Sequence, residues 1–140
     1  MIKCGIPFLL FHNNCEQALA YYREVFQAEI VETMTFEEVG YTDEKQRLSC
    51  IANSTFKLGE SIFYAADVID ENSAAEWNSS NRISVWLELE QEEEIRTVTE
   101  SLLGSGSKCL SPLETTFWNS LYTKIQDPFG VIWELNVQLQ

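Results

Sequence analysis

Apolar and polar residues repeat along this chain with two different periods, one typical of strands and the other of helices. The first apolar run, residues 6–11, is expected to form a strand, and a polar turn follows it. Residues 15–27 carry apolar side chains at steps of about three and four residues, which predicts a helix with one buried stripe. Asn14 precedes this helix and is a candidate for its N-terminal cap.

Apolar stretches after this helix alternate as strands do. Three strands are expected at residues 29–36, 47–56 and 61–65, and residues 57–60 are expected to form the hairpin turn between the last two. The polar segment 70–82 is expected to be a linker or a short helix.

The same order of elements then begins again. The second half is expected to hold a strand at 83–90, a helix at 91–103 ended by Gly104, and strands at 108–110, 121–126 and 131–137. Gly59 and Gly130 mark equivalent turns, so an internal duplication is the economical interpretation. We predict an α+β fold in one domain, residues 1–140, built from two β-α-β-β-β modules at roughly 1–68 and 82–140. The modules are expected to form a curved, partly closed sheet with the helices outside.

Period two also assigns side chains to the faces of the strands. In the strand at 83–90, alternate apolar residues suit the helix side, which leaves Trp86 and Glu88 on the opposite side. In the last strand, Glu134 takes that same opposite side. The pattern therefore predicts a concave inner face whose floor is both aromatic and acidic.

The aromatic residues Trp118 and Tyr122 are further candidates for this cavity. Together with Trp86 they can stack against a planar ligand. As residues of the core or of a dimer interface they need no ligand, and the sequence leaves both interpretations open.

The two acidic candidates also have alternatives. Glu134 on a partly apolar floor is expected to have a raised pKa, which suits a general base, and it can also be a metal ligand. The alternative is a structural carboxylate that accepts a hydrogen bond from Lys124 or from a backbone amide. Glu88 either contacts the ligand or is solvated at the edge of the sheet.

Length and composition are those of one folded domain. The 140 residues are 45% hydrophobic, enough to bury a core, and no apolar run approaches the ~20 residues of a membrane span. We therefore expect a cytoplasmic protein without a membrane partner. A net charge of −13 repels nucleic acid and favours a cationic ligand, although an acidic surface can also serve solubility alone.

Motifs for metal binding or nucleophilic chemistry are sparse. The four cysteines form no C-x-x-C pair and are expected to be buried free thiols. His12 is the only histidine and lies in the turn after the first strand, so no histidine cluster can bind a metal. The acidic run at 90–94 is better explained by the dipole of the helix that it begins.

Three segments, in order along nearly the whole chain, carry a recognisable set of signatures. They are residues 11–26, FHNNCEQALAYYREVF, residues 56–67, and Phe117-Trp118 followed by residues 127–134, DPFGVIWE. Together they resemble PhnB-like proteins, a branch of the vicinal-oxygen-chelate superfamily of glyoxalases, bleomycin-resistance proteins and dioxygenases. The first segment is similar to the opening F-x-x-N-A-E-E-A-L-x-F-Y-x-x-V-F of that branch.

The resemblance implies a homodimer with a ligand cavity in each curved sheet. It also implies where a divalent metal is held, because superfamily enzymes use His, Gln or Glu at places that fall on Pro7, Asn53, Ser84 and Glu134 here. Of these, only Glu134 is a strong ligand for a cation. We therefore predict no metal and no cofactor, and we keep Asn53 as a ligand-binding candidate.

The chain departs from the branch in two further ways. Some PhnB-like proteins are described as demethylubiquinone methyltransferase-like, but this chain has no Gly-rich strand-to-helix loop for S-adenosylmethionine, so methyl transfer is not expected. Where many PhnB-like proteins read Trp-Gly-Asp, this chain has Trp118-Asn119-Ser120, which removes a carboxylate from the rim of the cavity.

Three functions remain open from the sequence. The first is binding of a small aromatic or cationic molecule in an acidic aromatic cavity without a metal. The second is a lyase, isomerase or dioxygenase that uses a metal held by Glu134 and further partners. The third is an interaction protein whose cavity is filled by side chains and whose dimer surface matters most. The sequence leaves open whether catalysis occurs.

Overall fold

The structure is a computed structural model that describes residues 1–40, 47–68 and 82–140. The chain divides into two compact units, Met1–Asn72 and Ser73–Gln140. The segment 70–82, expected as a linker, lies outside the described residues except for Arg82. The single domain expected over the whole chain stays a prediction.

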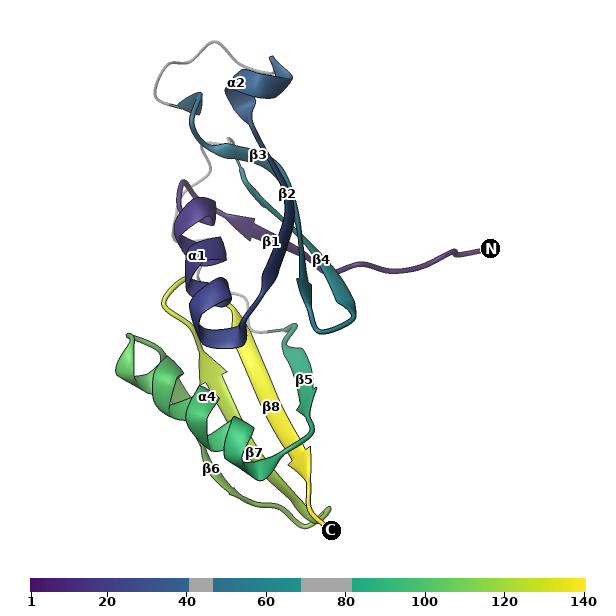
Figure 1. Cartoon of the computed structure of the whole chain (residues 1–140), viewed down its shortest axis with the longest axis vertical. Coiled ribbons are helices and arrows are strands. Elements are labelled where there is room, and N and C mark those ends of the chain that lie inside the picture. The colour runs from purple at the N-terminus through teal and green to yellow at the C-terminus, as the bar shows by residue number, and fades with distance from the viewer. Residues whose placement is uncertain (41–46, 69–81) are drawn as a thin grey trace. The chain divides into compact units, whose positions relative to one another are not determined.

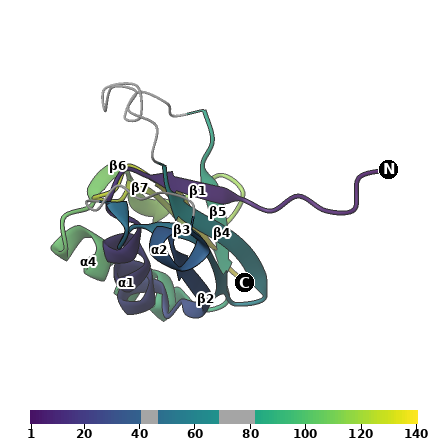
Figure 2. The same ribbon diagram turned by 90° about the horizontal axis from the view of Figure 1, so that it is seen from above.

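The first unit contains a four-stranded sheet. Its strands lie in the order β1-β4-β3-β2, and they are β1 (Phe8–Phe11), β2 (Glu29–Thr35), β3 (Ile51–Leu58) and β4 (Ser61–Asp67). Only β1 and β4 are parallel, while the hairpin β3–β4 and the pair β2–β3 are antiparallel. In both views the residues ahead of β1 extend away from the sheet (Figures 1 and 2).

Helix α1 (Cys15–Phe26) packs its buried stripe on one face of this sheet (Figure 1). Tyr22 is fully buried, and its ring lies 5.8 Å from that of Phe56. The Phe56 ring in turn stacks on Phe63 at 5.1 Å. Burial of each phenylalanine contributes about 1.5–3 kcal/mol, so this aromatic stack holds the helix on the sheet.

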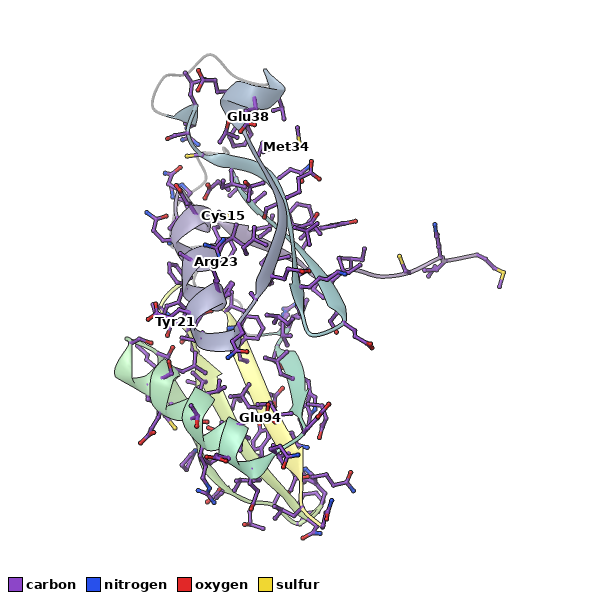
Figure 3. The ribbon with its side chains drawn as sticks, in the orientation of Figure 1. Cys15, Tyr21, Arg23, Met34, Glu38 and Glu94 are labelled. Carbon is purple, nitrogen blue, oxygen red and sulfur yellow. The ribbon has the colours of Figure 1, made fainter. Side chains whose placement is uncertain are left out.

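A short helix, α2 (Phe36–Val39), was not expected from the pattern. The Thr35 hydroxyl accepts a hydrogen bond from the Glu38 amide, and the Glu38 carboxylate accepts one from the Thr35 amide. This reciprocal arrangement is a capping box, and it starts a helix at Phe36, the last residue of the predicted strand 29–36. Figure 3 labels Glu38 on this helix. The next strand begins at Ile51, later than the predicted residue 47.

Asp67 caps α1 across a long stretch of chain. Its carboxylate is buried, and its two oxygens accept hydrogen bonds of 2.9 Å from the backbone amides of Cys15 and Ile51. Asn14 occupies the N-cap position, but its side chain makes no capping hydrogen bond. The prediction that Asn14 caps this helix is therefore wrong, and the carboxylate at the end of β4 accepts from the first amide of the helix instead.

The second unit repeats the architecture of the first. Its elements are β5 (Val85–Leu89), α4 (Glu92–Gly104), β6 (Lys108–Thr115), β7 (Ser120–Gln126) and β8 (Ile132–Gln138), and the strand order is β5-β8-β7-β6. Again only the first and last of these strands are parallel. The predicted α+β fold of two repeated β-α-β-β-β modules is confirmed.

Strand β6 is longer than the predicted 108–110. Pro112 interrupts the apolar pattern and lacks an amide donor, which a strand tolerates at an edge or a bulge. β6 is the edge strand of its sheet, and its pairing with β7 shifts register between Ser111 and Glu114. The proline therefore lies in the strand without ending it.

Helix α4 covers one face of the second sheet (Figure 1). Ile95 and Leu102 of the helix are fully buried, as are Trp133 and Leu135 of β8. At the start of the helix the Glu94 carboxylate accepts a hydrogen bond of 2.9 Å from the Gln91 backbone amide, and the Glu94 amide donates to the Gln91 carbonyl. Three glutamates in its first turn agree with the interpretation of the acidic run as compensation of the helix dipole.

All four cysteines are free thiols. Cys15, the first residue of α1, is buried, and Cys50 is half-buried. Cys4 and Cys109 are exposed, so the prediction of burial is wrong for both: one lies ahead of β1 and the other lies on the edge strand β6. None of the helices in the described parts of the chain is long and apolar enough to span a bilayer.

The substitution Asp67→Asn tests the long-range cap. An amide keeps one acceptor oxygen but turns an N–H towards the other backbone amide, so we expect a loss of about 2 kcal/mol of folding free energy. Urea unfolding monitored by circular dichroism measures it. Glu24→Gln, on the exposed side of α1, is the charge-matched control. Equal stability of the two variants would contradict the cap.

Candidate functional site

The parallel pairing of β5 with β8 builds one wall of polar and aromatic side chains in the second unit. Trp86 pairs with Glu134, and Glu88 pairs with Asn136. Because side chains alternate along a strand, these four lie on the face opposite the buried Trp133 and the helix. The predicted assignment of faces for this strand pair agrees with the structure.

A cavity of about 600 Å³ opens on this face. Its lining comes from β5, β7, β8 and the turn before β7, and consists of Trp86, Glu88, Trp118, Ser120, Asn136 and Gln138. This volume lies within the usual range for small-molecule sites, but the hollow is wide open to solvent and is not an enclosed pocket. The cavity combines two large aromatic surfaces with one carboxylate.

The aromatic rings of the site contact one another. Tyr122 stacks on Trp86 with ring centroids 5.7 Å apart and meets Trp118 edge-on at 5.6 Å. Trp86 remains 47% exposed and Trp118 41% exposed. Tyr122 thus fixes the spacing of the two indoles while leaving much of their surface open to a ligand.

Glu134 lies beside the cavity and is held by two hydroxyls. Ser84 donates to Oε2, and the Tyr122 hydroxyl donates to Oε1 at 2.6 Å. These two hydrogen bonds lower the pKa of Glu134, since together with the charge of Lys124 they outweigh burial. The predicted rise in the pKa of Glu134 is therefore wrong, and so is the alternative of a direct hydrogen bond from Lys124 or a backbone amide.

The same contact acts on Tyr122 in the opposite direction. Burial and the hydrogen bond to Glu134 raise the pKa of Tyr122 to about 12. The phenol therefore stays protonated at neutral pH and remains a donor to Glu134. At neutral pH Glu134 is therefore a carboxylate and Tyr122 a phenol. Such a pair fixes the orientation of the two side chains, but a carboxylate with a lowered pKa is a weak base.

The structure brings together five of the six candidate residues in the second unit. Trp86, Glu88 and Trp118 line the cavity, and Tyr122 and Glu134 adjoin it through the contacts above. Asn53 lies on β3 in the first unit.

Asn136 lines the cavity as well, and we had not selected it as a candidate. Its position two residues after Glu134 puts it on the same face of the strand, but an asparagine carries no charge or aromatic ring that would single it out. His12, in the turn after β1, belongs to the first unit.

The corresponding face of the first unit has a different chemistry. Phe8 of β1 pairs with Tyr64 of β4, and their rings meet edge-on at 5.8 Å. Phe8, Leu10, Ile62 and Tyr64 are all more than a third exposed. The duplicated topology therefore presents an apolar surface in the first unit and an acidic aromatic one in the second.

The chain belongs to the Glyoxalase/Bleomycin resistance protein/Dioxygenase superfamily, whose sequence pattern matches residues 6–135. Within it, the chain is similar to PhnB-like proteins over nearly its whole length. It is 27% identical over 144 residues to Protein YjdN of Escherichia coli (strain K12), which covers 96% of this chain and 95% of that protein.

Solved structures support the same relationship. The PhnB protein from Bacillus cereus is 26% identical, with a TM-score of 0.77 over 96% of this chain and 99% of that one. Protein PA1353 from Pseudomonas aeruginosa gives a TM-score of 0.78 at 23% identity, over 97% of this chain and 98% of that one. At that identity the second likeness shows the fold alone.

The donor set of the second unit does not fit the divalent metal that the superfamily implies. Each oxygen of Glu134 accepts a hydrogen bond from a hydroxyl group, one from Ser84 and the other from Tyr122. These two neutral hydroxyls are weak ligands for a metal ion. Within the described ranges, no group of three His, Cys, Asp or Glu side chains gathers in a way that could hold a metal ion. We derive no chemistry through a metal.

The turn that carries Trp118 is built on Asn119, which adopts a left-handed conformation with φ 59°. Asparagine and glycine both tolerate positive φ, so Asn119 at the place of the glycine in Trp-Gly-Asp preserves the turn. The side chain of Asn119 also donates to the Leu139 carbonyl at 3.3 Å.

We predict that the free energy of unfolding of Asn119→Ala is about 1 kcal/mol lower than that of Asn119→Gly. Both substitutions delete the hydrogen bond to Leu139, so the difference between them isolates the strain of positive φ. Paired urea titrations measure it. If alanine proves as stable as glycine, the left-handed turn is not present.

The contacts of Glu134 predict a pH dependence. A lowered carboxyl pKa stabilises the fold above the pKa of the unfolded chain, and this contribution is lost as pH falls through the folded value. Tyr122→Phe removes one donor and should raise the pKa of Glu134. The stability gap between wild type and variant should therefore be widest at neutral pH and shrink in acid.

Carbon-detected NMR titration of Glu134 measures this pKa directly, and denaturant unfolding across pH measures the gap. Tyr21→Phe, on α1 of the first unit, is the matched control. An unchanged Glu134 pKa in Tyr122→Phe would show that the hydroxyl does not hold the carboxylate.

Proposed function

We propose that the second unit binds a small aromatic or cationic molecule in its acidic aromatic cavity, without a metal. The observation that carries the proposal is the cavity of about 600 Å³ in which two half-exposed indoles flank the Glu88 carboxylate. An aromatic ring on such a surface gains about 0.5–1.5 kcal/mol beyond simple burial, and a cation over an indole face gains a similar amount. A net charge of −13 draws cations towards the chain.

The alternative of a metal-dependent lyase, isomerase or dioxygenase has less support. It requires Glu134 to exchange its two hydroxyl partners for a cation, and the second unit offers that cation only weak neutral neighbours. The superfamily contains enzymes, so metal analysis of the purified protein discriminates between the two functions. The homodimer implied by the resemblance also stays a prediction.

The proposal predicts that quinoline or its cation N-methylquinolinium binds and quenches indole fluorescence. Trp118→Leu should weaken that binding about tenfold, because it removes one aromatic wall worth about 1.4 kcal/mol. Isothermal titration calorimetry gives the affinities, and a chelator should leave them unchanged. Phe8→Leu, an exposed aromatic of the first unit, is the control.

Two results would count against this function. Absence of binding by both compounds would remove its support, as would equal affinities in wild type and Trp118→Leu. Loss of binding on chelation would transfer support to the metal-dependent alternative.

A further inference from the structure

A continuous chain of hydrogen bonds runs along the wall of the cavity. The Trp86 Nε1–H donates to Glu88 Oε1 at 3.0 Å. The Asn136 amide donates to both Glu88 oxygens, at 3.1 and 3.0 Å, and its own carbonyl oxygen accepts from Trp118 Nε1 at 3.2 Å. Asn136 is 4% exposed, so the residue at the centre of this chain is fixed in place.

These hydrogen bonds engage the indole N–H groups of both Trp86 and Trp118 with acceptors of the protein itself. A ligand therefore meets the faces of Trp86 and Trp118 and finds no indole donor for its own acceptors. The hydrogen-bond partners of Glu88 are neutral groups, so these contacts orient its negative charge without cancelling it. What remains for a ligand is π surface and one negative charge.

Counting acceptors shows which kind of cation suits the cavity. A carboxylate offers about four lone-pair sites, and both oxygens of Glu88 already accept hydrogen bonds, Oε1 from Trp86 and both of them from the one amide nitrogen of Asn136. A primary ammonium brings three N–H donors, and the partly used oxygens of Glu88 cannot accept all three. A quaternary ammonium brings none, so it loses no hydrogen bond when it leaves water for the cavity.

We infer that the cavity takes a quaternary ammonium compound, seated against Trp86 and Trp118 with its charge facing Glu88. This inference rests on the proposed function and narrows the ligand to one chemical class. Recognition by indole faces and a carboxylate selects the ligand by its charge and its lack of N–H donors. Asn136 acts as a positioning residue, because it orients both Glu88 and Trp118.

The test compares three benzyl compounds, of which the first two have the same shape and the third replaces the methyl groups by N–H donors. They are benzyltrimethylammonium, its neutral carbon analogue neopentylbenzene, and the primary ammonium benzylammonium. Calorimetry on the wild-type protein should show that benzyltrimethylammonium binds about tenfold more tightly than either of the others. This comparison needs no variant and so does not depend on the folding of one.

A pair of charge-matched variants then locates the selectivity. Glu88→Gln should abolish most of the preference for benzyltrimethylammonium over neopentylbenzene. Glu90→Gln removes the same charge from an exposed carboxylate just after β5 and outside the cavity lining, and it should leave the preference intact. Circular dichroism and thermal unfolding of both variants verify that each is folded.

The outcomes separate this inference from the proposed function. If all three probes bind equally, or if Glu90→Gln lowers the preference as much as Glu88→Gln, the inference is overturned while binding in the aromatic cavity stands. If no probe binds, the inference fails as well. If the quinoline compounds also fail to bind, the proposed function falls with it.

Discussion

The parallel pairing of β5 with β8 is the constraint on which the site depends. It brings together two strands that are far apart in the sequence and sets Trp86 beside Glu134 and Glu88 beside Asn136. One face of this strand pair must pack under α4, because Trp133 and Leu135 need burial. Because side chains alternate along a strand, the polar and aromatic residues of the pair then lie on the other face, where α4 does not cover them.

The two units show how one topology can carry two chemistries. Their strand orders are identical, so both expose one face of a sheet beside a parallel pair. In the first unit that face carries Phe8 and Tyr64, whereas in the second it carries Trp86 and Glu134. The repeated topology supplies the scaffold, and the side chains on the open faces give each unit a different surface. Membership of the superfamily defines the scaffold, while the open faces must be interpreted residue by residue.

Periodicity predicted most of the fold because it records which face of each element is buried. It assigned Trp86, Glu88 and Glu134 to one surface from spacing alone. It could not find the capping box at Thr35, which is local hydrogen bonding unrelated to burial, or the cap supplied by Asp67 from a distant strand. The length of β6 was also missed, since a proline is acceptable only on an edge that the sequence does not identify.

The chemistry of the site was harder to predict than its location. Glu134 was expected to have a raised pKa because burial was judged without its partners, and the hydroxyls of Ser84 and Tyr122 reverse that direction. Asn136 was overlooked for a related reason. Its importance lies in the two neighbours that it joins, Glu88 and Trp118, and contacts of this kind appear only once the strands are paired.

The first turns of α1 and α4 are stabilised by residues at very different distances along the sequence, and this difference bears on the order of folding. Helices of about 12–15 residues are marginal by themselves in water. α4 carries its own start signal, because Gln91 and Glu94 are three residues apart and can meet before any sheet exists. The first amide of α1 instead donates its hydrogen bond to Asp67, which lies 52 residues further along the chain. Closing a loop of that length delays such a contact, so we expect α1 to become complete only as β4 docks, with the helix and the sheet of the first unit forming together.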